Sequence, residues 1–101
     1  MSVGYIMEFD GAGRVDYDVV TRALGIDAET GGGDWPLGLE FHAAGAKPGG
    51  WLVFEIWESQ EAQERYMERR LRPALEEDGR SGLPTRVEWV ELVSALTPGP
   101  A

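Results

Sequence analysis

The most hydrophobic segment of the chain is residues 51–57 (WLVFEIW), in which Glu55 is the only polar residue. β-Branched and aromatic residues dominate this segment, a composition typical of a strand. A strand with one face in water alternates apolar and polar residues, and this segment does not. The pattern therefore predicts a strand covered on both faces. Ser59 follows as a candidate N-cap, and from there the pattern predicts a helix over 59–72.

Three further segments alternate between apolar and polar residues in the way that strands do: 3–9, 37–44 and 85–93. In the first segment the odd-numbered residues are all apolar and are expected to share one face, with Ile6 and Glu8 on the other. In the second, the alternation places Leu39 and Phe41 on one face and Glu40 and His42 on the other. The chain is therefore expected to contain four strands.

Apolar residues at helical spacing predict a first helix over 16–24. The long connection that follows, 26–36, holds three consecutive glycines and Trp35. Loops of this length are uncommon in compact domains and often act as lids, so both a lid and a plain connector are open interpretations. Residues 45–50 are rich in turn formers and predict a hairpin loop. Pro73 is expected to interrupt the second helix.

The resulting order is strand, helix, strand, strand, helix, strand, which predicts an α+β, ferredoxin-like fold. In that fold both helices cover one face of a four-stranded antiparallel sheet. Residues 1–96 are expected to form this single domain, and 97–101 a C-terminal tail. The second sheet face is apolar too, and soluble monomers rarely expose so large a patch. We therefore expect a homodimer that forms through the sheet face.

Composition and missing motifs argue against several classes of function. The chain carries 9 basic and 18 acidic residues, a net charge of -9 that opposes nucleic acids and anionic membranes. It has no cysteine, which excludes disulfides and thiolate chemistry. No signal peptide and no membrane span are visible, so a cytoplasmic protein is expected. No Walker loop or Gly-x-Ser-x-Gly elbow is present. A single histidine gives no ligand spacing for a metal, and no cofactor is expected.

His42 is the only histidine, and histidine is the side-chain type that ordinarily titrates near neutral pH. If Ala44 faces Trp51 across the hairpin, Glu40 lies opposite Glu55, and His42 shares their face. A base beside carboxylates and indole rings suits removal of a proton from a phenol or a 1,3-diketone. A structural, hydrogen-bonded histidine is the alternative interpretation.

The other candidate residues would complete such a site. They are the apolar walls Trp35, Trp51 and Trp57, the orienting hydroxyls Tyr17 and Tyr66, and Glu8 as a further base or orienting carboxylate. Core packing is the alternative for the two tyrosines. A paired surface carboxylate is the alternative for Glu8.

Four short motifs give the sequence a family resemblance: FHxAG at 41–45, GWxV at 50–53, WES at 57–59 and LxPAL at 71–75. The chain resembles small actinobacterial proteins of the dimeric α+β barrel superfamily, close to the antibiotic-biosynthesis-monooxygenase-like (ABM-like) domains. The resemblance implies a ligand site between the helices and the sheet and chemistry without a metal. His42, Trp51 and Trp57 lie at matching motif positions.

The resemblance, together with the surroundings of His42, implies a small cofactor-independent monooxygenase that acts on an aromatic or polyketide-like small molecule, with His42 as general base. A polyketide cyclase of the same fold is one alternative. A non-catalytic ligand-binding or assembly dimer is another, and haem binding through His42 is a third. Fold alone does not choose among these functions.

Overall fold

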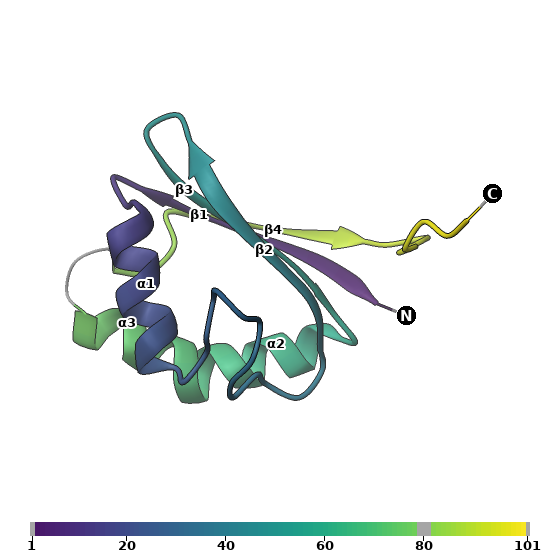
Figure 1. The fold of residues 1–101 in the computed structure, drawn as a ribbon, viewed down its shortest axis with the longest axis horizontal. Coiled ribbons are helices and arrows are strands. Elements are labelled where there is room, and N and C mark those ends of the chain that lie inside the picture. Colours follow the sequence, from purple (N-terminus) through teal and green to yellow (C-terminus); the bar gives the residue numbers. More distant parts are fainter. Residues whose placement is uncertain (1, 79–81, 101) are drawn as a thin grey trace.

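The computed structural model describes residues 2–78 and 82–100. In chain order the elements are β1 (Val3–Asp10), α1 (Arg14–Ala23), β2 (Leu39–Lys47), β3 (Gly50–Trp57), α2 (Gln60–Tyr66), the π-helical η1 (Met67–Leu71), α3 (Arg72–Asp78) and β4 (Arg86–Glu91). The strands form one antiparallel sheet in the order β2-β3-β1-β4. Figure 1 shows the helices together on one side of that sheet. The α+β, ferredoxin-like prediction is confirmed.

The core lies between the sheet and the helices. Tyr5, Met7 and Phe9 of β1 are all buried, so the face that the alternation led us to expect them to share is the one that faces the helices. The other large buried apolar residues come from β3 and from both helical segments: Val53, Trp57, Val20, Leu24, Tyr66, Leu71 and Leu75. The inner sheet face thus carries the hydrophobic contacts that hold the helices.

The second helical segment begins as expected and ends differently. The Ser59 hydroxyl accepts a hydrogen bond from the Ala62 N–H at 3.1 Å, so Ser59 is the N-cap. The chain then stays helical through Asp78, and the interruption expected at Pro73 is a change of helix type instead. A proline ring clashes with the carbonyl four residues earlier in a regular helix. The wider turns of η1 lie immediately before Pro73 and relieve that clash.

The hairpin between β2 and β3 is tighter than the sequence suggested. Lys47 pairs with Gly50, which leaves only Pro48 and Gly49 in the turn. Gly49 has φ +79°, the left-handed conformation that glycine tolerates, and proline before it suits a type II turn. The six-residue loop expected at 45–50 is therefore wrong, because β2 continues through its small residues to Lys47.

This turn sets the register of the hairpin. Ala44 pairs with Val53 rather than with Trp51, and His42 lies directly opposite Glu55. The expected register was wrong by two residues. A change of two preserves the face on which each side chain lies, because side chains alternate with a period of two. His42 and Glu55 therefore still share the helix-covered face, and they are closer than expected.

A bulge at the start of β2 corrects a second expectation. The register shifts between Leu39 and Phe41, so Leu39 pairs with Trp57 while Phe41 pairs with Ile56. The extra residue breaks the alternation, and Leu39 and Phe41 lie on opposite faces instead of sharing one. Glu40 sits at the bulge, exposed, and accepts a hydrogen bond from the Ser2 hydroxyl at 2.5 Å.

The outer face of the sheet is apolar along most of its area. Its residues, which we call the outer patch, are Ile6, Phe41, Leu52, Phe54, Ile56 and Val90. Phe41 is 49% exposed and packs edge-on against Phe54 at 6.2 Å between ring centroids. No helix of the described residues covers this face (Figure 1).

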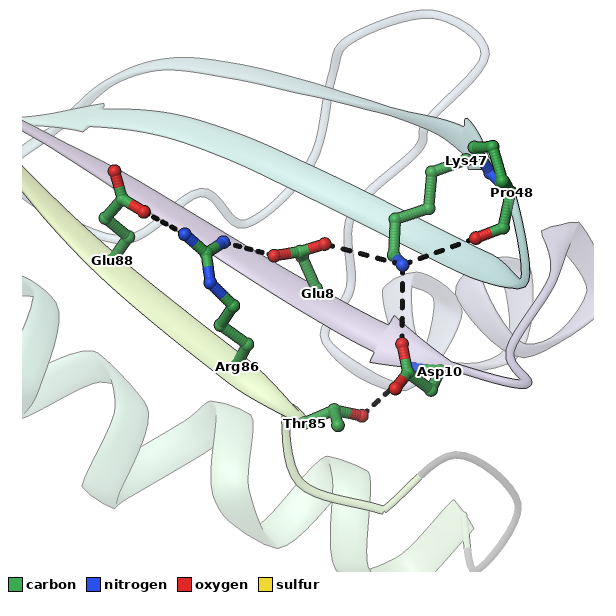
Figure 2. Close-up of polar contacts among 7 residues, drawn as sticks. All are labelled: Glu8, Asp10, Lys47, Pro48, Thr85, Arg86 and Glu88. Carbon is green, nitrogen blue, oxygen red and sulfur yellow. Dashed lines mark hydrogen bonds and ion pairs between the residues drawn. The ribbon is translucent and has the colours of Figure 1, made fainter.

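Charged residues border the outer patch at one end. Figure 2 shows this charged row, which comprises Glu8, Asp10, Lys47, Arg86 and Glu88. Arg86 lies between Glu8 and Glu88, and Lys47 lies between Glu8 and Asp10. The row holds both signs of charge side by side, so each buried or half-buried charge has a partner.

After β4 the chain extends away from the sheet (Figure 1). The expected last strand, 85–93, ends at Glu91, and Val93 and Leu96 are among the most exposed hydrophobic residues described. No helix of the described residues is long and apolar enough to cross a membrane.

Candidate functional site

A cavity of about 60 Å³ lies between α1, the second helical segment and the inner face of the sheet. Most of its walls are apolar, and they include Met7, Phe9, Val20, Leu24, Trp35 and Trp51. Its polar groups include Tyr17, His42 and Glu55. The engineered apolar cavity that binds benzene measures about 150 Å³, so a ring-sized ligand would have to enlarge this one.

Three hydrogen bonds connect four side chains at the cavity. The Tyr17 Oη lies 2.6 Å from His42 Nε2, and His42 Nδ1 lies 2.8 Å from Glu55 Oε2. The Trp57 indole N–H donates to the other carboxylate oxygen, Glu55 Oε1, at 3.0 Å. Tyr17 comes from α1, His42 from β2, and Glu55 and Trp57 from β3. We call this series the Tyr–His–Glu chain.

Glu55 and Trp57, at the buried end of the Tyr–His–Glu chain, both belong to the sheet. Glu55 is 4% exposed and Trp57 is fully buried. A buried carboxylate is costly unless it is hydrogen-bonded, and Glu55 has a donor on each oxygen. Because His42 and Glu55 are directly opposite residues of paired strands, the backbone itself brings them together.

These contacts define where the protons lie. A carboxylate can only accept, so His42 Nδ1 carries the hydrogen that points at Glu55. In the neutral imidazole Nε2 then has a lone pair, and it accepts the hydrogen bond from the Tyr17 hydroxyl. Burial raises the pKa of Tyr17, and the negative charges of Glu55 and Asp18 raise it further.

Trp35 reaches the cavity from the long connection between α1 and β2. Its ring centroid lies 5.3 Å from that of His42, and its indole N–H donates to the Gly31 carbonyl at 2.8 Å. The loop is closed on itself by a bridge between Ile26 and Gly33. Gly33 has φ +112°, and a Cβ there would lie 2.3 Å from the carbonyl oxygen of residue 25. The connection is thus an ordered loop with Trp35 as one wall of the cavity.

Arg70 ties this loop to the second helical segment. Its guanidinium donates to the Leu24 carbonyl at 2.7 Å and to the Asp34 carboxylate at 3.1 Å. Arg70 lies in η1, and π-helical turns inside helices are frequent at functional sites. Sequence reasoning missed this contact, since its partners are 46 and 36 residues away along the chain and no local pattern marks them.

Trp51 is a wall residue with an unused donor. Its indole nitrogen is buried and has no hydrogen-bond partner among the described residues. Buried donors are nearly always paired, with protein or with water. The Trp51 ring lies 5.4 Å from that of Tyr17, and both residues line the cavity.

Most of the site residues expected from the sequence meet at this cavity. Six of them line it: Tyr17, Trp35, His42, Trp51, Glu55 and Tyr66. Trp57 lies behind them and binds Glu55. Burial raises the pKa of Tyr66 to about 12, so its phenol is neutral.

Glu8 and Glu40 are not brought to the cavity. Glu8 lies on the outer sheet face in the charged row, where it binds Arg86 and, at 3.4 Å, Lys47. The hydrogen bond from Arg86 lowers the pKa of Glu8. The sheet separates Glu8 from His42. Glu8 pairs with Leu52 and His42 with Glu55, and Leu52 and Glu55 lie on opposite faces of β3. Glu40 is exposed at the bulge, which turned it away from the face it was expected to share with Glu55.

Among residues 2–78 and 82–100, no group of three or more His, Cys, Asp or Glu side chains is placed to hold a metal ion. A second hollow, of about 540 Å³, lies beside β4. Its lining includes Tyr5, Met67, Arg72, Val87 and Trp89. Burial raises the pKa of Tyr5 to about 12. The carboxylates in its lining, Glu64 and Glu68, are both exposed.

Comparison with solved structures identifies the architecture. A protein from Chloroflexus aurantiacus described as an antibiotic biosynthesis monooxygenase superposes with a TM-score of 0.64 at 13% identity, covering 98% of this chain and 100% of its own. SnoaB, a cofactor-independent oxygenase from Streptomyces nogalater, gives a TM-score of 0.63 at 15% identity, with 96% and 98% covered. The fold is that of the ABM-like proteins.

Rv0793 from Mycobacterium tuberculosis shares this ABM-like fold, with a TM-score of 0.65 at 15% identity over 96% of this chain and 100% of its own. No family model and no curated protein matches the sequence. At such low identities the likeness establishes the fold, and the activity must be argued from the site itself.

Proposed function

We propose that this protein is a cofactor-independent monooxygenase of the ABM-like type that acts on an aromatic or polyketide-like small molecule. The observation that carries the proposal is the Tyr–His–Glu chain at the polar end of an apolar cavity. An apolar pocket with a few convergent polar groups is the usual form of a small-molecule site. The likeness to SnoaB, a cofactor-independent oxygenase, supports the reaction class.

His42 supplies the general base. Glu55 orients the imidazole and stabilises the positive charge that develops when Nε2 gains a proton. Removing a proton from a phenol or an activated methylene gives an electron-rich anion, and the low dielectric of the cavity strengthens its interaction with the imidazolium.

The anion then reacts with dioxygen. Dioxygen adds to the anionic carbon, a proton completes the hydroperoxide, and loss of water leaves a carbonyl. Overall a CH₂ group and O₂ become C=O and H₂O, with the four electrons that reduce dioxygen coming from the substrate carbon. The balance requires no further reductant.

Oxygen uptake tests this proposal. A panel of phenols and 1,3-diketones is supplied to the wild type, to His42→Gln and to Glu76→Gln, an exposed control on α3. His42→Gln is expected to slow turnover by about 100-fold or more, the usual contribution of a general base, while the control keeps the wild-type rate. Equal rates in all three proteins would contradict the role of His42. Substrate consumption without oxygen uptake would favour the cyclase.

We also propose a homodimer formed through the outer patch. The patch is apolar and uncovered by the described helices, and a two-fold interface would place it against the same patch of a second copy. Sedimentation is expected to give twice the chain mass for the wild type and a single chain for Phe54→Asp. A wild type that remains a monomer at micromolar concentration would contradict this assembly.

A further inference from the structure

The general base assigned above is already occupied. The Tyr17 hydroxyl lies 2.6 Å from His42 Nε2, a short hydrogen bond. The Nε2 atom of a neutral imidazole has one lone pair, and it lies in the ring plane. The Tyr17 and His42 rings are nearly parallel, with an interplanar angle of 16° and centroids 5.9 Å apart, and the Tyr17 oxygen is the atom that meets Nε2. A substrate atom cannot occupy the same position while Tyr17 is there.

Two further side chains contact the imidazole. Its Nδ1–H points at Glu55, and the Trp35 ring packs beside it with centroids 5.3 Å apart. Tyr17 itself lines the cavity, against the ring of Trp51. The polar atom of this chain that remains available to a ligand is therefore the Tyr17 oxygen, which has a second acceptor position after donating its hydrogen to His42.

We propose that Tyr17 is a catalytic residue whose oxygen takes the substrate proton while its own proton passes to His42 Nε2. This inference rests on the proposed function, because it assigns the proton path of that same site. The substrate O–H or C–H bond breaks, and its electron pair stays on the substrate. A new O–H bond forms on Tyr17, its original hydrogen moves to Nε2, and the products are the substrate anion and an imidazolium held by Glu55.

The surroundings of Tyr17 agree with this path. Burial and the charges of Glu55 and Asp18 raise the pKa of the Tyr17 phenol, so a lasting phenolate is disfavoured in the resting protein. A hydroxyl that must stay neutral can still relay a proton if it receives one as it releases another. His42 therefore acts through Tyr17, and both groups are required for the same proton transfer.

A probe whose anion absorbs visible light tests the relay without knowledge of the natural substrate. We would mix 4-nitrophenol with the protein below the pKa of the free probe and follow the phenolate band by stopped flow. Wild type is expected to generate the phenolate on binding. Tyr17→Phe is expected to slow that step by about 100-fold or more, as His42→Gln does. Tyr5→Phe, a matched change outside the cavity, keeps the wild-type rate.

The outcomes separate the relay from the proposed function. If Tyr17→Phe forms phenolate as fast as wild type while His42→Gln does not, His42 reaches the substrate directly and the relay is overturned, although the base stands. If wild type forms no phenolate, the base and the relay both fall. A proton inventory on the wild type needs no variant. In H₂O–D₂O mixtures a two-proton relay gives a curved dependence of rate on deuterium fraction, and a linear dependence overturns it.

Discussion

Replacing Glu55 is expected to weaken the fold and the site together. The Glu55 side chain is 6% exposed and accepts hydrogen bonds from His42 at 2.8 Å and from Trp57 at 3.0 Å. In Glu55→Leu both buried donors lose their acceptor, at about 1–3 kcal/mol each, or about 2–6 kcal/mol together. Removing a buried charge and burying an apolar side chain offset part of this cost. We expect a net loss of about 2–4 kcal/mol.

Glu55→Gln removes the charge of the side chain and keeps its size. The amide oxygen still accepts from Trp57, but its NH₂ group meets His42, whose Nδ1 must then accept. A hydrogen bond contributes about 1 kcal/mol less to the free energy of unfolding when its charged partner becomes neutral. The neutral amide is also less costly to bury, which offsets part of that loss. We expect a loss of about 1 kcal/mol. The imidazole would then carry its hydrogen on Nε2, so the variant should fold and yet fail as a base.

Thermal unfolding followed by circular dichroism measures both effects. In a domain of this size each kcal/mol lowers the melting temperature by about 4–8 °C, so Glu55→Leu should lower it by at least about 10 °C. Glu76→Leu on α3 is the exposed control and should change stability by no more than about 0.5 kcal/mol. A Glu55→Leu protein at least as stable as the wild type would refute this reasoning. It would mean that the two hydrogen bonds do not offset the burial of the carboxylate.

Three further predictions concern the frame around the site. Ser59→Ala removes the N-cap bond and should cost about 1 kcal/mol in urea unfolding, whereas an equal midpoint would exclude a capping role. Arg70→Gln removes the guanidinium fork that holds the loop, so Trp35 fluorescence should become more accessible to acrylamide. Unchanged quenching would show that the loop holds itself. The pKa of Tyr66 is raised to about 12, so the stability from its neutral burial is complete below pH 10 and is lost as pH rises toward 12, by at most about 2.7 kcal/mol. Tyr66→Phe should flatten that loss in alkaline urea unfolding, and an equal slope would contradict it.

The sequence determines faces more reliably than contacts. The alternation along β1 predicted which of its residues share a face, and the side-chain oxygen of Ser59 predicted the start of α2, because both signals act within a few residues. The common face of His42 and Glu55 was also predictable. Their direct contact was not, since it depends on a two-residue turn at Pro48 and Gly49 that the many glycines around it obscured.

Two site assignments failed for different physical reasons. Glu8 was placed on the correct face, but nothing local told which face the helices cover at that end of the sheet, or that Arg86 would bind it there. Glu40 was misplaced by a bulge, which adds one residue to a strand and leaves the composition unchanged. Arg70 reaches its partners only because η1 and a loop far away in sequence meet in space.

One spectrum tests the central claim most directly, and the chain is suited to it because His42 is its only histidine. Labelling histidine with ¹⁵N gives one imidazole in the NMR spectrum, whose two nitrogens report which of them carries hydrogen. The account predicts a hydrogen on Nδ1, facing Glu55, and a bare Nε2 that accepts from Tyr17. A neutral ring with its hydrogen on Nε2 would contradict the base, the relay and the role given to Glu55.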